Sequence, residues 1–196
     1  MLIDDFMPVW DFSEKHETVV RASAGEVSAA LKTADFSESF IVRWLLRLRG
    51  MSGENVTLAS LKNTKFRILA ERENEEVVIG LAGQFWKPAG NMQDVDAGNF
   101  REFDKPGFAK ATWNFTLHAL QGEDLTDSAP ETRLTTETRI RCMDDKSRAS
   151  FRFYWTFIKP FSGWIRSEML AVVKLKAEDG IDGKMRRHGE GEKRHI

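Results

Sequence analysis

Few side chains in this 196-residue chain have the type and spacing of a reactive site. Residues 153–178, FYWTFIKPFSGWIRSEMLAVVKLKAE, follow a helical period. On this predicted helix Glu168 falls inside the apolar arc, and Tyr154, the only tyrosine, lies on the same stripe. A carboxylate facing an apolar interior must be paired, hydrogen-bonded or neutral. Glu168 and Tyr154 are therefore the candidate acid–base pair. The structural alternatives are a rim position or salt bridge for Glu168 and core packing for Tyr154.

The other chemistry-bearing residues form no motif of known mechanism. The sequence contains no HExxH, CxxC, GxSxG, P-loop or GxGxxG pattern, so we expect neither a metal nor a cofactor. Strand alternation places His118 on an outer face. The single cysteine, Cys142, ends a predicted strand with no histidine near it, which indicates a buried, unreactive thiol. The lack of an inward histidine or a second inward carboxylate counts against an enzyme.

The composition is that of an ordinary globular domain with an excess of apolar aromatics. The chain has 29 Lys and Arg against 30 Asp and Glu, and 14 Phe and 6 Trp against one Tyr. This charge balance lacks the basic excess of a nucleic-acid partner. No apolar run approaches the ~18 residues of a membrane span, the first residues lack the basic stretch of a secretory signal, and one cysteine fits a reducing compartment. We therefore expect a cytoplasmic protein with no transmembrane segment, while its oligomeric state stays open.

The hydrophobic pattern predicts a strand, two helices, a run of antiparallel strands and a long final helix. The first strand is expected over 14–23, and the two helices over 23–34, capped by Ser23, and 37–50. The later strands are expected over 66–73, 76–86, 99–103, 109–120 and 132–142. Strands grouped in this way indicate an α+β fold rather than alternating βαβ units.

Two predicted elements would enclose an interior between them. Alternation in the later strands turns Trp113, Phe115, Thr136 and Thr138 inward, whereas the row of Arg133, Arg139 and Arg141 reads as a solvated outer face. On the long helix an apolar stripe covers about half the cylinder, and Leu170 breaks its pattern. The stripe consists of Phe151, Tyr154, Ile158, Phe161, Ile165, Met169 and Val172. Pro160 removes one backbone hydrogen bond, so we expect a bend there that helps set the size of the interior.

Four segments carry a resemblance to a known superfamily: HETVVRASAGEVSAAL, GLAGQFWKP, RLTTETRIRC and FRFYWTFIKPFSGWIRSEML. Together they resemble the START-like (SRPBCC) superfamily, which includes plant pollen allergens and polyketide cyclases, and within it a mostly uncharacterised bacterial branch. The resemblance covers residues 1–178 as a single domain. It implies a helix-grip fold: a curved antiparallel sheet of six to seven strands wrapped around a long kinked C-terminal helix, with two short helices after the first strand and an apolar cavity inside.

The pattern itself provides six clear strands, so the seventh would lie within 57–64 or 87–98. Residues 179–196 are mostly glycine and charge and are expected to form a mobile tail. The superfamily includes lipid carriers, hormone binders, cyclases and chaperone regulators, so the resemblance does not fix a function.

Three functions stay open, and we favour the first. The chain would bind a hydrophobic or amphipathic small molecule, lipid or polyketide-like, in the cavity. It would otherwise be a cyclase or dehydratase that uses Glu168 and Tyr154, or an interaction module with a vestigial pocket. The expected lining residues are Phe66, Ile68, Ile79, Leu81, Phe85, Trp113, Phe115, Leu117, Thr136 and Thr138 from the sheet and Tyr154, Ile158, Phe161, Ile165 and Met169 from the helix.

Overall fold

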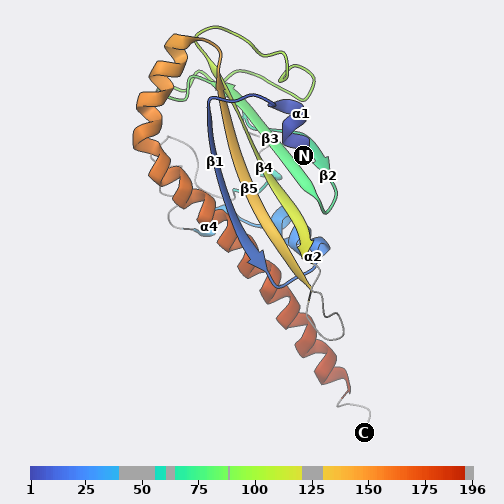
Figure 1. Ribbon diagram of the computed structural model, residues 1–196. Helices are drawn as coiled ribbons and strands as arrows, with labels where there is room; N and C mark the ends of the chain where they lie inside the picture. Colours follow the sequence, from blue (N-terminus) through green and yellow to red (C-terminus); the bar gives the residue numbers. More distant parts are fainter. Residues whose placement is uncertain (40–55, 61–64, 88, 121–129, 193–196) are drawn as a thin grey trace.

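The computed structural model describes residues 1–39, 56–60, 65–87, 89–120 and 130–192. Its centre is one antiparallel sheet of five strands in the order β1-β5-β4-β3-β2 (Figure 1). The strands are β1 (Phe12–Val20), β2 (Arg67–Arg72), β3 (Glu76–Gly83), β4 (Ala109–Leu120) and β5 (Glu131–Cys142). The long helix α4 (Asp145–Glu192) crosses one face of this sheet. The predicted α+β class, with an antiparallel sheet and a long C-terminal helix, is confirmed.

The first helix after β1 forms where its capping residues predict. Helix α2 (Ala24–Thr33) begins after Ser23, whose hydroxyl accepts from the Glu26 N–H while the Glu26 carboxylate accepts from the Ser23 N–H. This capping box satisfies two backbone donors that the first turn leaves open. Of the second predicted helix, over 37–50, the structure shows a 3-10 turn (η1, Phe36–Glu38), and residues 40–55 lie outside the described residues.

The sheet has fewer strands than the six to seven expected. Residues 99–103, expected to form a strand, form turns instead. The carboxylate of Asp96 accepts from the N–H groups of Gly98 and Asn99, and the Asp96 carbonyl accepts from the N–H of Phe100. These local bonds satisfy the backbone without a ladder partner. Between 87 and 98, Gln93 forms a single bridge with Ala82, and residues 57–60 form a turn, while 61–64 lie outside the described part.

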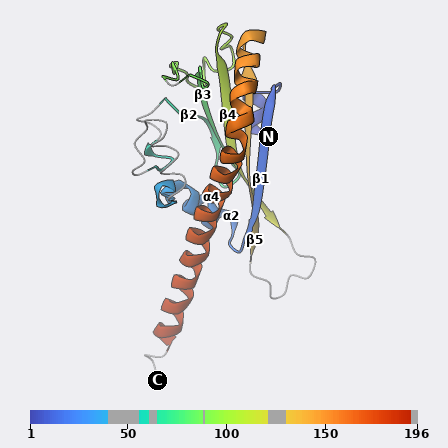
Figure 2. The same ribbon diagram turned by 90° about the vertical axis from the view of Figure 1, so that its left-hand side faces the viewer.

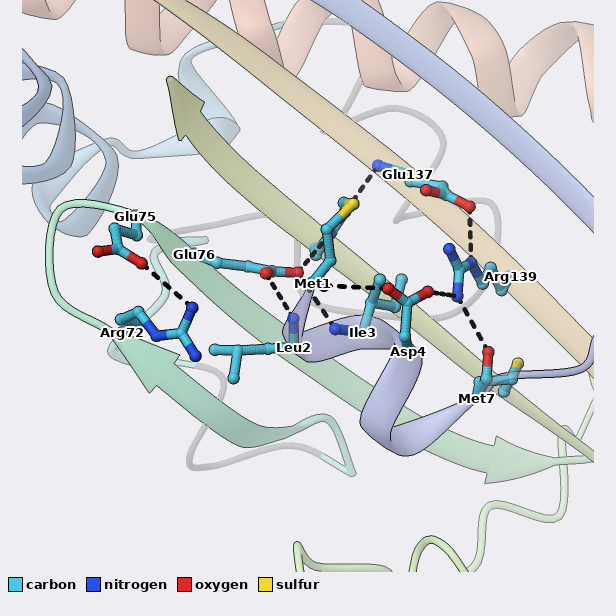
Figure 3. Close-up of polar contacts among 11 residues, drawn as sticks. Met1, Leu2, Ile3, Asp4, Met7, Arg72, Glu75, Glu76, Glu137 and Arg139 are labelled. Carbon is cyan, nitrogen blue, oxygen red and sulfur yellow. Dashed lines mark hydrogen bonds and ion pairs between the residues drawn. The ribbon is translucent and has the colours of Figure 1, made fainter. Parts of the chain in front are cut away.

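Part of the outer face of the sheet is covered rather than solvated. Helix α1 (Leu2–Phe6) packs there, and its apolar side chains join Leu69, Val78, Ala82, Val95 and Phe100 in a small core. Figure 3 shows the carboxylate of Glu76 facing the start of α1. This buried carboxylate accepts from the N–H groups of Leu2 (2.7 Å) and Ile3 (3.2 Å) and from the Asn114 side chain (2.7 Å). Glu76 thus binds α1 to strands β3 and β4.

Arg139 corrects the prediction of a solvated arginine row. Its side chain is 5% exposed because α1 and the chain that follows it lie over it. The guanidinium donates to Asp4 (2.7 Å), to Glu137 (2.6 Å) and to the Met7 carbonyl (3.0 Å), as Figure 3 shows. The neighbouring Arg133 and Arg141 are exposed as expected. A partner surface made of all three arginines is therefore excluded.

Helix α4 continues through Pro160 without a break, and its axis changes direction in the orange part of the ribbon in Figure 1. The face that it buries is rotated from the predicted stripe. Phe161 of the predicted stripe is exposed, whereas Leu170, expected outside the stripe, is buried together with Val173. The helix packs over β1 and β5 and against α2. Residues 179–192 of the predicted tail continue the helix, and their mobility stays a prediction.

Candidate functional site

Three polar or polar-tipped side chains form one row across the inner face of the sheet, beneath α4. Glu14 on β1 pairs in the ladder with Thr138 on β5, and Thr138 pairs with Trp113 on β4. Directly opposed residues on one face of a sheet have Cβ atoms ~5 Å apart. From the helix, the guanidinium of Arg166 lies 5.2 Å from the centre of the Trp113 ring. The row and Arg166 therefore occupy one small volume between the sheet and the helix.

The polar atoms of this volume are buried and unsatisfied. Glu14 Oε2, Thr138 Oγ1, Trp113 Nε1 and Arg166 Nε each have no hydrogen-bond partner among the residues that the structure describes. A buried donor or acceptor left without a partner costs about 1–3 kcal/mol. Native proteins keep few such groups, and a cluster of them marks a place where water or a ligand completes the bonding. We call Glu14, His16, Thr138, Trp113 and Arg166 the inner polar cluster.

His16 belongs to this cluster because it lies two residues beyond Glu14 on the same face of β1. Its Nε2 is 2.9 Å from Glu14 Oε1, so the carboxylate orients the imidazole. Gly163 of α4 passes directly over the pair. A Cβ built at this position would lie 2.6 Å from Glu14 Oε1, closer than real Cβ contacts allow. The absence of a side chain at Gly163 thus lets the helix approach the two residues.

Arg166 places a cation in an environment of low polarity. Burial is the larger influence on it and lowers the pKa of Arg166 to about 10, while the nearby Glu14 carboxylate opposes this change. Its Nη1 is 3.9 Å from the Met169 sulfur, and its guanidinium faces the Trp113 ring. In the described residues it forms no ion pair within 4.0 Å. The inward position of Arg166 is the main consequence of the rotated helix face.

The predicted pair of Glu168 and Tyr154 is not brought together. Fourteen residues separate them on one helix, which corresponds to about 21 Å along its axis at ~1.5 Å per residue. Glu168 is half-buried and accepts a hydrogen bond from the Ser39 hydroxyl at 3.0 Å. Tyr154 is half-buried and its ring lies 5.8 Å from that of Phe151. One small substrate could not contact both, so the structure gives no support to this acid–base pair.

Most predicted lining residues lie in the core between the sheet and the helices. The buried ones on the sheet are Ile79, Leu81, Trp113, Phe115, Leu117, Thr136 and Thr138. Phe66 and Phe85 pack half-buried against this core, as do Tyr154 and Ile165 of α4, whereas Met169 is buried. Ile158 is also half-buried. Thr136 is already satisfied, because its hydroxyl donates to the Asn114 carbonyl at 2.7 Å.

Two of these residues are corrected by the structure. Phe161 is 43% exposed because α4 turns this part of its apolar arc away from the sheet, so it does not line the interior. Ile68 is 36% exposed, beside an irregularity in the pairing of β2 with β3 that interrupts the register. Ile68 lies at the rim of the inner face rather than within it.

Two hollows open at the surface, and neither lies over the inner polar cluster. One, of about 590 Å³, runs beside the first half of α4 and is lined by Trp86, Ala149, Ser150, Phe153, Tyr154, Phe157 and Ile158. The other, of about 300 Å³, lies between α2 and the β2–β3 hairpin, where Ile68 and Leu117 are among its walls. Their walls include four of the predicted lining residues, but both hollows open at the surface and neither is the predicted enclosed cavity.

Sequence reasoning missed Glu14 and His16, although a signal for them was present. Residues 12–20, FSEKHETVV, alternate, and Phe12, Glu14, His16, Thr18 and Val20 share one face. Phe12 and Val20 are the apolar ends of that face and contact the inner core. An expected strand over 14–23 omits Phe12, so on this face of the strand the polar Glu14, His16 and Thr18 precede the apolar Val20 and read as solvated. The objection that no histidine or second carboxylate faces inward was therefore wrong.

Comparisons with known proteins do not identify a function for this chain. No protein-family model and no curated protein matches the chain. A solved structure of TTHA0849 from Thermus thermophilus is 10% identical, covers 86% of this chain and 99% of its own, and has a TM-score of 0.35. That of the Zhui aromatase/cyclase from Streptomyces sp. R1128 is 13% identical, covers 87% and 95%, and has a TM-score of 0.32. Likenesses this weak carry no argument about this chain.

Proposed function

We propose that the chain binds an amphipathic small molecule whose polar group occupies the inner polar cluster. The observation that supports this is the set of four unsatisfied polar atoms contributed by three neighbouring strands and α4. Trp113 and Thr138 are more than nine-tenths buried, so bulk water does not satisfy them. An apolar interior with a few convergent polar groups is the usual composition of a small-molecule site.

The unsatisfied atoms also indicate what the polar group must offer. Trp113 Nε1 and Arg166 Nε are donors, Glu14 Oε2 is an acceptor while ionised, and the Thr138 hydroxyl is both. A ligand that carries a carbonyl or carboxylate oxygen next to a hydroxyl would satisfy all four. The surrounding Phe66, Ile79 and Met169 are apolar, so the rest of the molecule would be hydrocarbon or aromatic. Each Å² of apolar surface buried would contribute roughly 25 cal/mol before ordering costs.

The test uses 1-anilinonaphthalene-8-sulfonate, an aromatic anion, as a probe, beside mass spectrometry of the protein before and after denaturation. We expect Arg166→Met to weaken probe binding at least tenfold, because the sulfonate loses its buried cation. Arg133→Met, which changes an exposed arginine on the outer face of β5, is the matched control and should leave the affinity unchanged. Equal probe affinity in the parent and Arg166→Met would refute the proposed site.

A second candidate function is proton transfer, and the pair of Glu14 and His16 favours it. A carboxylate 2.9 Å from an imidazole holds the ring in one orientation, and Arg166 and Trp113 would offer N–H donors to an oxygen that gains charge. A suitable probe is a β-diketone in D₂O, whose exchange of carbon-bound hydrogen is followed by NMR. Exchange accelerated by the parent, lost in His16→Gln and kept in His118→Gln would support catalysis. Exchange no faster than in buffer would exclude proton transfer and leave ligand binding as the only proposed function.

A further inference from the structure

The outward side of α4 carries a continuous row of exposed aromatic residues. Phe153, Phe157, Phe161 and Trp164 are 72%, 61%, 43% and 52% exposed, and their spacing of four, four and three residues places them on one face. The rings of Phe153 and Phe157 are 5.1 Å apart. Figure 2 looks onto this side of the molecule and shows α4 lying in front of the sheet. We call these four residues the aromatic stripe.

Such a stripe is unusual on a surface that only meets water. Single exposed apolar residues are common, but contiguous apolar patches mark sites of interaction. The larger hollow adjoins the stripe, since Phe153 and Phe157 line it together with Trp86 and Ile158. An apolar partner could therefore cover the stripe and enter the hollow.

The half of α4 that carries the stripe has a net positive charge. Residues 146–167 contain five basic residues and no Asp or Glu. Arg166 is turned inward, and Arg148 is paired with Asp11 and Asp145. Lys146, Arg152 and Lys159 remain exposed, and none of the three has an ion-pair partner in the described part of the chain. The surface that meets the stripe should thus be anionic.

These observations decide between two occupants of the stripe. A second copy of the chain seated on the stripe would bring two positively charged helix halves together, including two copies of Lys146, which lies two turns before Phe153 on the same face, and like charges repel across an interface. An anionic lipid surface would instead attract this half of the helix and accept the aromatic rings at the level of its headgroups. No helix within the described residues is long and apolar enough to cross a bilayer, so α4 would lie in the interface. We propose that the aromatic stripe docks the protein on anionic membranes.

The experiment is sedimentation of the full chain with vesicles of phosphatidylcholine alone and of phosphatidylcholine with 30% phosphatidylglycerol, at low and physiological salt. We expect binding to the anionic vesicles only, weakened by salt because the attraction is partly electrostatic. Phe157→Ser with Trp164→Ser should reduce the partition coefficient at least tenfold, and Lys146→Glu severalfold. The matched controls are Val19→Ser, 39% exposed on β1, and Arg133→Glu, its ladder partner on β5, and both should bind as the parent does.

Several outcomes would overturn the proposal. No sedimentation at low salt, or equal binding to neutral vesicles, would exclude an anionic lipid surface. Binding that the double serine variant retains would exclude the stripe. If the parent is a dimer and the double serine variant is a monomer, the stripe is an interface between copies of the chain. Circular dichroism of each variant controls for folding. The proposed membrane docking does not depend on ligand binding in the inner polar cluster. If the double serine variant loses vesicle binding but binds 1-anilinonaphthalene-8-sulfonate as the parent does, the two functions are separate.

Discussion

Replacing Arg166 by methionine should make the ligand-free protein more stable and bind its ligand less well. Burial lowers the pKa of Arg166 from the ordinary arginine value to about 10. A tenfold change in proton affinity corresponds to about 1.4 kcal/mol, so holding the guanidinium charged inside the fold costs roughly 3 kcal/mol. Because the folded pKa is the lower one, this penalty is fully present below pH 10 and fades as the pH rises above 10 toward the ordinary arginine pKa.

The pKa of about 10 already includes the attraction between Arg166 and Glu14, but methionine also removes the contact with the Trp113 ring, which offsets some of the gain. We therefore expect Arg166→Met to raise the free energy of unfolding at pH 7 by about 1–3 kcal/mol, as apolar replacements of buried charges do elsewhere. The measurement is urea unfolding of protein shown by mass spectrometry to carry no ligand. Arg152→Met is the control and should lie within about 0.5 kcal/mol of the parent, as exposed substitutions do. A loss of more than about 1 kcal/mol in Arg166→Met would mean that Arg166 is a structural residue, and the reasoning from unsatisfied atoms would fail.

Four further predictions follow from the contacts. Glu76→Gln should lower the free energy of unfolding by about 2–3 kcal/mol in urea titrations, because an amide cannot accept from both N–H groups of α1 and from Asn114. Gly163→Ala should weaken binding of 1-anilinonaphthalene-8-sulfonate by displacing the Glu14 carboxylate, whereas Gly180→Ala, whose Cβ meets nothing within 4 Å, should not. Burial raises the pKa of Cys142 to about 12, so the folded protein should resist thiol reagents at pH 8 and react once unfolded. Hydrogen bonds from the N–H groups of Ser147 and Gly107 lower the pKa of Asp144. The stability that Asp144 contributes is therefore present above the ordinary aspartate pKa near 4 and is lost as the pH falls through the lower folded value. Asp144→Ala should reduce this loss of unfolding free energy at acid pH.

The strands were predictable where one face is apolar and the other polar. The pattern places β4 at 109–120, its observed bounds, because Trp113, Phe115 and Leu117 alternate with polar residues. Alternation also gives the correct inward face of β5. It fails on β1, whose inward residues include Glu14 and His16, because binary patterning treats every polar residue as solvated. The covering of Arg139 by α1 was equally hidden, since it depends on a contact between residues 135 positions apart.

The face of α4 that packs on the sheet could not be read from its sequence. Apolar residues occupy about half of the helix surface, so several arcs were compatible with packing. The structure buries the arc that includes Leu170 and Val173 and leaves Phe157 and Trp164 exposed. Periodicity measures which residues lie together on a helix, and not which side meets the core. Choosing between arcs needs the shape of the sheet and the position of Gly163, where the backbone of α4 passes close to Glu14.

The bend, the glycine and the inner polar cluster have a common basis in the sequence KPFSGWIR, residues 159–166. Pro160 removes one backbone hydrogen bond, which permits the helix to change direction there. Three residues later, Gly163 allows close approach to Glu14 and His16, and three residues after that Arg166 lies on the side that meets the sheet. Residues three apart on a helix are neighbours on its surface. A side chain at Gly163 would clash with the Glu14 carboxylate unless α4 lay farther from β1. The unsatisfied cluster therefore follows from this spacing, and its cost in stability is the physical reason to expect a ligand there.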